Sequence, residues 1–249
     1  MAVVLGGLAL VPAPARATAD AEAPSPARLE TFELPSDLVD PASAGGRLED
    51  RRRAPKVHVL LPAGYVHAPD RDYPVLWLLH GANGGTDTWL PDILEEAAGF
   101  PGIVVMPDGG VFGMYMDWWN GGRREGPAWA SFHLDVLRQT IEDRYNIRPG
   151  RRWHAIGGIS MGGQGALRYA ALLPGYFGSV AALSAAMPDT QAVEFQGGLD
   201  LVDAMNGPVG ASYETIYGPA QAPYAEGNSP RALVGNLAHT RIYLTSGWG

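Results

Sequence analysis

The chain contains no cysteine among its 249 residues. It therefore has no disulfide framework, no thiolate metal site and no cysteine nucleophile. An HExxH pair is also missing, and no other set of histidines and carboxylates has the spacing of zinc ligands. We expect neither a metal nor any other cofactor.

Positive charge is scarce as well. The sequence has 18 Lys and Arg residues against 26 Asp and Glu residues, and its formal net charge is −8. This balance argues against a nucleic acid partner. The one dense basic cluster, residues 51–53, fits a solvated loop before a strand. Residues 162–165 (GGQG) lack the Lys-Ser or Lys-Thr ending of a phosphate loop, so nucleotide binding is not expected.

No apolar run is long enough to cross a bilayer, so we expect no transmembrane segment. The run at residues 2–11 has the length of a signal-peptide core, and Ala15 and Ala17 offer small residues before a cleavage site at Thr18. The positively charged region that normally precedes such a run is missing. The alternative to a signal peptide is a buried helix or a disordered leader. We interpret residues 1–19 as a signal peptide with an incomplete start, and we expect secretion. Residues 20–28 read as a disordered leader and 29–249 as one domain.

Strand and helix patterns alternate along the domain. Short apolar segments predict strands at residues 29–34, 56–61, 75–79, 103–106, 153–157, 180–183 and 241–245. The apolar period predicts helices at 129–145 and 163–173. This alternation indicates an α/β domain with a mostly parallel, doubly wound sheet and flanking helices. The segment 188–236 reads as a lid or cap beside the site.

The most informative motif is the pentapeptide GISMG at residues 158–162. It lies between a predicted strand and a predicted helix, which is the context of a nucleophile elbow. Glycine flanks Ser160 because the turn leaves no room for side chains, and the helix behind it directs its free N–H groups at a developing oxyanion. The alternative is a glycine-rich helix start with a capping serine.

Acyl transfer also needs two backbone N–H donors for the oxyanion. One is expected at Met161, the residue after the nucleophile, and the other in the loop after the third strand of such folds. That loop reads HGANGG at residues 80–85, and Ala82 is the candidate donor. An ordinary strand-to-helix turn is the alternative.

These motifs resemble the secreted α/β-hydrolases of the antigen 85 and esterase D type. The matching stretches are residues 75–85, 102–120, 132–145, 155–174 and 236–247. The resemblance implies an α/β-hydrolase fold and cofactor-free ester hydrolysis or acyl transfer through an acyl-enzyme. It implies that Ser160 is the nucleophile, that the N–H groups of Ala82 and Met161 form the oxyanion hole, and that the substrate is a small-molecule or lipid ester.

The chain departs from the mycolyltransferase members of that group. They carry an Asp and an Arg in the loop occupied here by residues 80–83, and those charges help to hold a sugar headgroup. His80 and Asn83 would contact substrate differently, although a loop-orienting role for His80 is the stronger interpretation. Asp117 and Trp118 lie near the expected site, where they either line an acyl pocket or form a packed cluster.

In elbow-type hydrolases the acid and the histidine of the triad follow the serine. Only His239 follows Ser160, and it precedes the last predicted strand. The family's acid and histidine would fall beyond Gly249, so we expect the domain to lack its C-terminal part and this polypeptide to be nearly inactive and poorly folded. A serine esterase, an acyltransferase to a sugar or lipid hydroxyl, and a non-catalytic binding protein remain open.

Overall fold

The computed structural model describes residues 25–39, 54–67, 70–96, 99–122, 127–185, 212–219, 227–228 and 231–246. The predicted signal peptide and most of the predicted lid lie outside these residues. Of the expected leader at 20–28, the structure describes residues 25–28. The first strand already begins at Arg28, and the carbonyl of Ser25 accepts a hydrogen bond from the Gly64 N–H.

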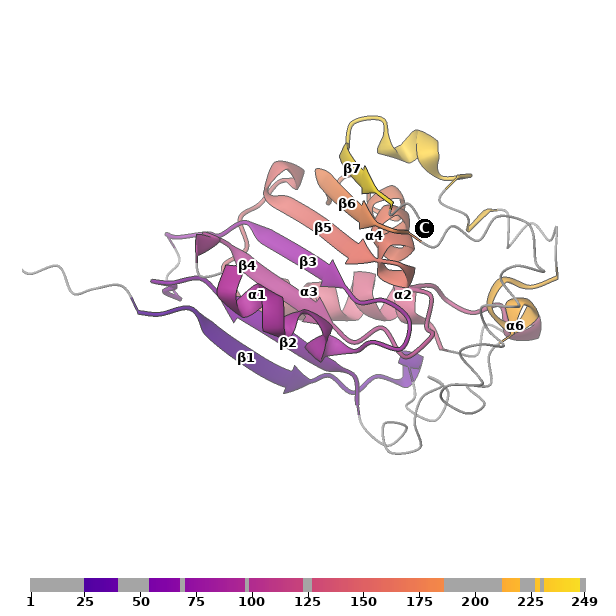
Figure 1. The fold of residues 1–249 in the computed structure, drawn as a ribbon, viewed down its shortest axis with the longest axis horizontal. Helices are drawn as coiled ribbons and strands as arrows, with labels where there is room; N and C mark the ends of the chain where they lie inside the picture. The colour runs from indigo at the N-terminus through magenta and orange to yellow at the C-terminus, as the bar shows by residue number, and fades with distance from the viewer. Residues whose placement is uncertain are drawn as a thin grey trace, which may run out of the picture.

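Seven strands form one sheet in the order β1-β2-β4-β3-β5-β6-β7, which Figure 1 shows from its face. β1 pairs antiparallel with β2 and β2 with β4, whereas β4, β3, β5, β6 and β7 run parallel. The strands are β1 (Arg28–Glu33), β2 (Lys56–Leu61), β3 (Val75–Leu79), β4 (Ile103–Pro107), β5 (His154–Ile159), β6 (Ser179–Leu183) and β7 (Arg241–Thr245). The prediction of a mostly parallel sheet is confirmed.

Helices cover both faces of the sheet. The 3-10 turn η3 (Thr86–Trp89) and α1 (Leu90–Glu96) lie on one face, where they pack over β2, β3 and β4. The opposite face carries α2 (Trp129–Ser131), η6 (Phe132–Leu137), α3 (Arg138–Arg144) and α4 (Met161–Leu172), which enclose the larger core (Figure 1). The remaining short turns are η1 (Asp37–Val39), η5 (Asn120–Gly122), η7 (Arg151–Trp153), α6 (Tyr213–Tyr217) and η8 (Val234–Leu237).

The helix predicted at 129–145 is confirmed as one continuous segment, α2-η6-α3. Its middle part, η6, is a π-helical turn, a form that is rare and is frequent at functional sites. Phe132, Leu137 and Ile141 of this segment are fully buried and Val136 is half-buried, as the apolar period of the segment requires. β3 lies in the middle of the sheet; it is fully buried on one face and partly buried on the other, where Leu76 and Leu78 pack on the smaller core, whereas all of β4 is buried.

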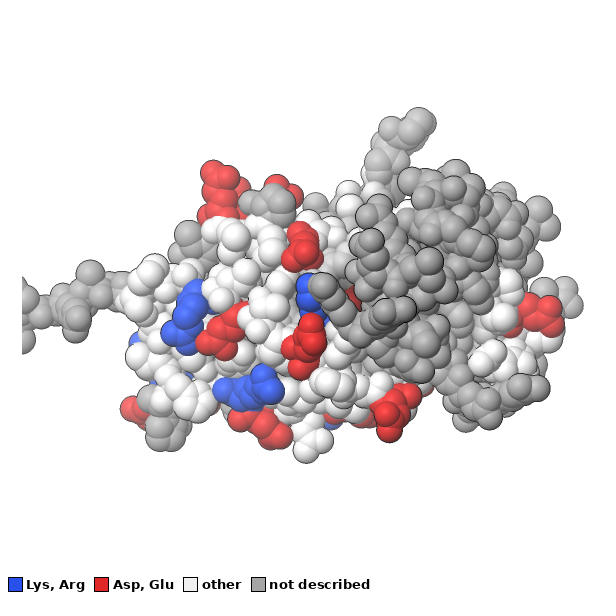
Figure 2. All heavy atoms as spheres, turned by 90° about the horizontal axis from the view of Figure 1, so that it is seen from below, with Lys and Arg blue, Asp and Glu red and all other residues white. Residues whose placement is uncertain are grey.

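The surface carries mixed charges. Figure 2 shows basic and acidic side chains interspersed on the described part of one face, without a continuous basic area there. This agrees with the low positive charge of the sequence. Among the described residues, no helix is both long and apolar enough to span a membrane. At one edge of the sheet, β7 is the outer strand and each of its residues is exposed.

Candidate active site

Ser160 occupies a tight turn between β5 and α4. Its backbone φ is 53° and its ψ is −115°, a conformation that is costly for a residue with a side chain and is typical of a nucleophile elbow. The Ser160 N–H donates to the carbonyl of Leu183 at 2.8 Å, which fixes the turn against the end of β6. The turn therefore holds a strained serine at the carboxyl edge of the sheet.

The flanking glycines are required by close backbone contacts. A Cβ atom on Gly158 would lie 2.2 Å from the Gly162 carbonyl oxygen, and one on Gly162 would lie 2.1 Å from the Leu79 carbonyl oxygen. Both contacts are shorter than any real Cβ atom makes. The second one shows that the start of α4 packs directly on the end of β3, where the predicted oxyanion loop begins.

This loop, residues 80–85, lies beside Ser160. A Cβ atom on Gly81 would be 3.6 Å from the Cβ atom of Ser160. The N–H groups of Ala82 and Met161 donate to no acceptor within the described residues, whereas the next N–H, that of Asn83, donates to the Val111 carbonyl at 3.0 Å. Two backbone donors thus lie close to the serine without an internal partner.

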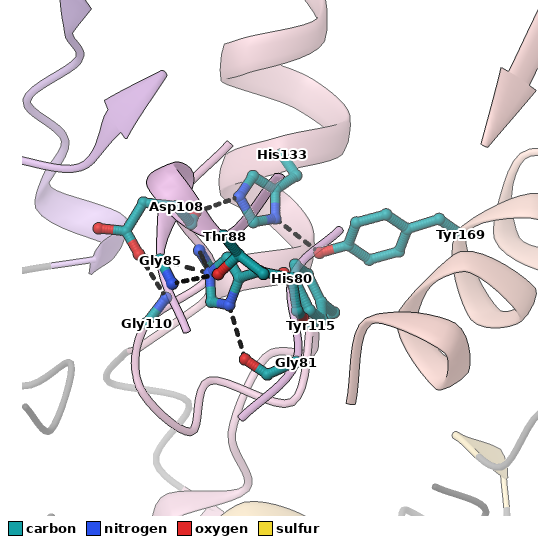
Figure 3. A network of polar contacts seen from close by, with 10 residues as sticks. His80, Gly81, Gly85, Thr88, Asp108, Gly110, Tyr115, His133 and Tyr169 are labelled. Carbon is teal, nitrogen blue, oxygen red and sulfur yellow. Dashed lines mark hydrogen bonds and ion pairs between the residues drawn. The ribbon is translucent and has the colours of Figure 1, made fainter. Parts of the chain in front are cut away.

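His80 lies behind this loop, as Figure 3 shows. The His80 ring is 1% exposed, its Nδ1 lies 2.8 Å from the Gly81 carbonyl oxygen, and its Nε2 accepts the Gly109 N–H at 2.8 Å. The ring is enclosed and both nitrogens are bonded, which argues against a direct contact between His80 and the substrate. The alternative interpretation, a loop-orienting residue, fits this placement.

A buried polar network continues from His80 (Figure 3). Asp108, at the end of β4, accepts the Gly110 N–H at 2.9 Å. Burial alone would raise the pKa of Asp108, but the Gly110 N–H donates to its carboxylate and favours the charged form, and the pKa of Asp108 lies below its usual value. Asp108 is therefore ionised at neutral pH.

His133, on the π-turn η6, completes the network. Its Nε2 lies 2.8 Å from the Asp108 carbonyl oxygen and its Nδ1 lies 2.8 Å from the Tyr169 hydroxyl. Burial lowers the pKa of His133 to about 4, so the ring is neutral. Because a carbonyl oxygen only accepts, Nε2 carries the proton and Nδ1 accepts from Tyr169.

Asp117 and Trp118 form part of a packed cluster. The Asp117 carboxylate accepts the N–H of Ser131 at 3.0 Å and its hydroxyl at 2.7 Å. Trp118 is 5% exposed and its indole N–H donates to the Gly113 carbonyl at 3.1 Å. These contacts favour the packed-cluster alternative for the two residues over a role in binding substrate.

Two further predicted features border this region. Asn83 is exposed and has a φ of 61°, so it remains a candidate substrate contact on the oxyanion loop. Of the predicted lid, α6 is described. It packs on the loop that follows Trp118, where the Trp119 N–H donates to the Ile216 carbonyl at 2.9 Å.

Comparison with known proteins gives the family of the chain. A family described as "Putative esterase" matches residues 50–249. The chain belongs to this esterase family. Esterase Rv1288 of Mycobacterium tuberculosis (strain ATCC 25618 / H37Rv) is 40% identical over 134 residues, which cover 52% of this chain and 29% of that protein. The diacylglycerol acyltransferase/mycolyltransferase Ag85A of Mycobacterium ulcerans is 30% identical over 187 residues, covering 71% of this chain and 54% of that protein.

The esterase-family chain thus spans less than two thirds of the length of either curated relative. Among solved structures, the serine hydrolase FphF of Staphylococcus aureus superimposes with a TM-score of 0.68 at 18% identity, covering 90% of this chain and 80% of that one. This likeness, with the strand order, confirms the predicted α/β-hydrolase fold.

The esterase-family chain has six histidines, and the structure describes all of them. Both nitrogens of His80, His133 and His58 are engaged by protein atoms. His154 and His239 lie at the amino ends of β5 and β7, whereas Ser160 lies at the carboxyl end of β5. His67 follows β2 beside Tyr65 and is exposed. We find no histidine here that is placed to take the Ser160 proton.

Sequence reasoning missed Tyr115, Asp108 and the role of His133. The Tyr115 hydroxyl donates to the His80 carbonyl at 3.1 Å, and burial raises the pKa of Tyr115 well above its usual value, so the donor proton is retained. The only pattern in the sequence that could have pointed to Asp108 is the DGG turn at residues 108–110. Within the described residues, no group of His, Cys, Asp and Glu could hold a metal ion.

Proposed function

We propose that the chain is a carboxylic-ester hydrolase of the serine type, with Ser160 as the nucleophile that forms an acyl-enzyme. The observation that carries this proposal is the pairing of a strained, elbow-type serine with two backbone N–H groups that have no acceptor in the described part of the chain. The Ser160 oxygen attacks the ester carbonyl, and the N–H groups of Ala82 and Met161 stabilise the oxyanion that forms.

The reaction needs a base for the serine proton. Because the six histidines are all engaged or remote, we predict that the 249-residue polypeptide turns over esters slowly by itself. Free imidazole in the buffer can supply the missing base. It should therefore raise the rate at which Ser160 is acylated.

The test is acylation of Ser160 by a nitrophenyl ester and by a fluorophosphonate probe, read by intact mass, with and without imidazole. We expect one modification per chain, an increase in rate with imidazole, and loss of both in Ser160→Ala. Ser184→Ala is the matched control, because Ser184 is an exposed serine with a positive φ at the end of β6. A probe that reacts equally with Ser160→Ala would contradict the proposal and favour a non-catalytic binding role.

A second function, acyl transfer to a sugar or lipid hydroxyl, is supported by the identity to Ag85A over 71% of this chain. The acyl-enzyme would be the same and an alcohol would replace water as the acceptor. Product analysis of the imidazole-assisted reaction, with and without an added sugar or glyceride alcohol, separates the two functions. A new ester as the main product would favour transfer.

We also infer that the protein acts outside the cytoplasm. The apolar run at residues 2–11, followed by Ala15 and Ala17, supports this location. The mass of the protein recovered from the culture medium of a producing cell is the test. It should correspond to a chain that begins at or near Thr18, and retention of the whole protein inside the cells would contradict export.

A further inference from the structure

The bonds of His80 define which of its nitrogens carries the proton. Nε2 accepts the Gly109 N–H at 2.8 Å through its lone pair, so this nitrogen carries no proton. Nδ1 lies 2.8 Å from the Gly81 carbonyl oxygen, which can only accept, so Nδ1 carries the proton. The ring is therefore a neutral imidazole in a single tautomer, and it donates to Gly81.

The Gly81 carbonyl belongs to the same peptide unit as the Ala82 N–H. In a trans peptide these two groups point in opposite directions, so a contact that holds one also orients the other. We propose that His80 is a positioning residue, which holds the Gly81 carbonyl so that the Ala82 N–H faces the oxyanion formed at Ser160. This inference rests on the proposed function, because it assigns the second oxyanion donor of that reaction.

Neighbouring contacts hold the rest of the loop in the same register. The Tyr115 hydroxyl donates to the His80 carbonyl at 3.1 Å, and the Asn83 N–H donates to the Val111 carbonyl at 3.0 Å. Successive peptide units of the loop are thus anchored to the segment that follows β4. The donor is held in place before substrate binds, which is the condition under which an oxyanion hole contributes most to the rate.

A direct catalytic role for His80 does not fit these contacts. The ring is 1% exposed, so its nitrogens do not reach substrate. The nearest Asp108 carboxylate oxygen lies 3.7 Å from Nε2, which is too far for a hydrogen bond. The lone pair of Nε2 already accepts the Gly109 N–H. His80 therefore acts through the Gly81–Ala82 peptide and not as an acid or a base.

Two substitutions separate the two bonds of His80. In His80→Asn the amide nitrogen takes the place of Nδ1 and can still donate to Gly81. In His80→Gln the amide group reaches the place of Nε2 and the bond from Nδ1 to the Gly81 carbonyl is lost, so that only the Gly84 N–H, at 3.1 Å, still donates to this carbonyl. We expect imidazole-assisted acylation of Ser160 to stay within about threefold of wild type in the Asn variant. In the Gln variant the limiting rate should fall by about 10- to 100-fold, with little change in the ester concentration for half-maximal rate.

His58→Asn is the matched control, because His58 is also buried and doubly bonded but its bonds go to the side chains of Thr31 and Asp87 and not to the oxyanion loop. It should acylate like wild type. If Ser160 is acylated in His80→Gln as fast as in His80→Asn, or faster, the positioning role is overturned while the proposed function stands. Failure of wild-type Ser160 to react would overturn both.

Nitrogen-15 NMR of the histidine rings gives a readout that does not depend on activity. We expect His80 to show a protonated, slowly exchanging Nδ1 and an unprotonated Nε2 in the wild-type chain. The opposite tautomer, or a doubly protonated ring at neutral pH, would overturn the proposal, because Nδ1 or Nε2 would then lack the bond assigned to it.

Discussion

Two regions of this molecule are built around a buried histidine, and they differ in what the histidine holds. His80 binds backbone groups, the Gly81 carbonyl and the Gly109 N–H. His58, on β2, binds side chains, with Nδ1 2.7 Å from the Thr31 hydroxyl and Nε2 2.7 Å from the Asp87 carboxylate. The two rings thus secure the beginning and the end of the segment from residue 80 to residue 89.

The difference decides what each histidine can influence. A bond to a backbone carbonyl sets the direction of a peptide unit, and with it the direction of the next N–H. A bond to Asp87, whose side chain is 77% exposed, only ties a surface turn to the sheet. The His80 region should therefore affect both stability and reactivity, whereas the His58 region should affect stability alone. Four changes test this contrast.

The largest effect is expected from Gly162→Ala. The added Cβ atom would lie 2.1 Å from the Leu79 carbonyl oxygen and 2.6 Å from that of His80, so the elbow and the oxyanion loop must separate. We expect a loss of about 4 kcal/mol in the free energy of unfolding and a fall of more than about 100-fold in Ser160 acylation. Urea unfolding and intact-mass kinetics measure the two effects. Gly175→Ala, where a Cβ atom meets nothing within 4 Å, should change neither.

The next effect is on the pH dependence of stability. His133 has a pKa of 6.5 when unfolded and about 4 when folded, so the unfolded chain binds more protons between these values. Stability is therefore complete above pH 6.5 and is lost as the pH falls toward 4. We expect the free energy of unfolding to decrease by about 2 kcal/mol between pH 7 and pH 5. In His133→Gln this decrease should shrink, and an unchanged decrease in that variant would assign it to other groups.

A smaller effect is expected from Tyr115→Phe. The buried His80 carbonyl loses its hydroxyl donor, and an unpaired buried acceptor costs about 1 to 2 kcal/mol. Acylation of Ser160 should fall severalfold, since the peptide before Gly81 is less firmly held. Tyr243→Phe, at an exposed position of β7, is the control and should leave both quantities unchanged. Equal acylation rates in Tyr115→Phe and wild type would show that this bond does not contribute to the loop's register.

The smallest effect on reactivity is expected from His58→Ala. The loss of two side-chain bonds should lower the free energy of unfolding by about 1 to 2 kcal/mol. Acylation of Ser160 should stay within about twofold of wild type, when it is measured well below the unfolding transition. A loss of reactivity as large as that of His80→Gln would remove the contrast between the two regions.

Much of the fold follows from local patterns. Strands such as β2 and β7 were predicted from their apolar or β-branched residues, and the helix at 129–145 from its apolar period. The GISMG motif predicts the elbow because only glycine fits on both sides of so tight a turn. The unequal burial of the two faces of β3 was not predicted, because a short apolar run has the same appearance whether both faces of a strand are fully buried or one is buried only in part.

The network behind the oxyanion loop was not foreseen from the sequence. His80, Asp108, His133 and Tyr169 come from four separate segments, and no spacing along the chain relates them. The same holds for Trp118, whose position beside a predicted site suggested a substrate contact although the indole is packed in the core. Proximity in sequence to a motif says little about which way a side chain points.

The sequence by itself determined the elements and the reactive motif, since turn sterics and apolar periodicity act between residues that are neighbours along the chain. Only the tertiary structure decided which backbone N–H groups beside Ser160 have no acceptor among the described residues and which nitrogen of His80 carries its proton. Those properties depend on hydrogen-bond partners that folding brings together from β3, β4 and η6. A protonation state is set by the atoms around the group, and these are defined only when the chain has packed.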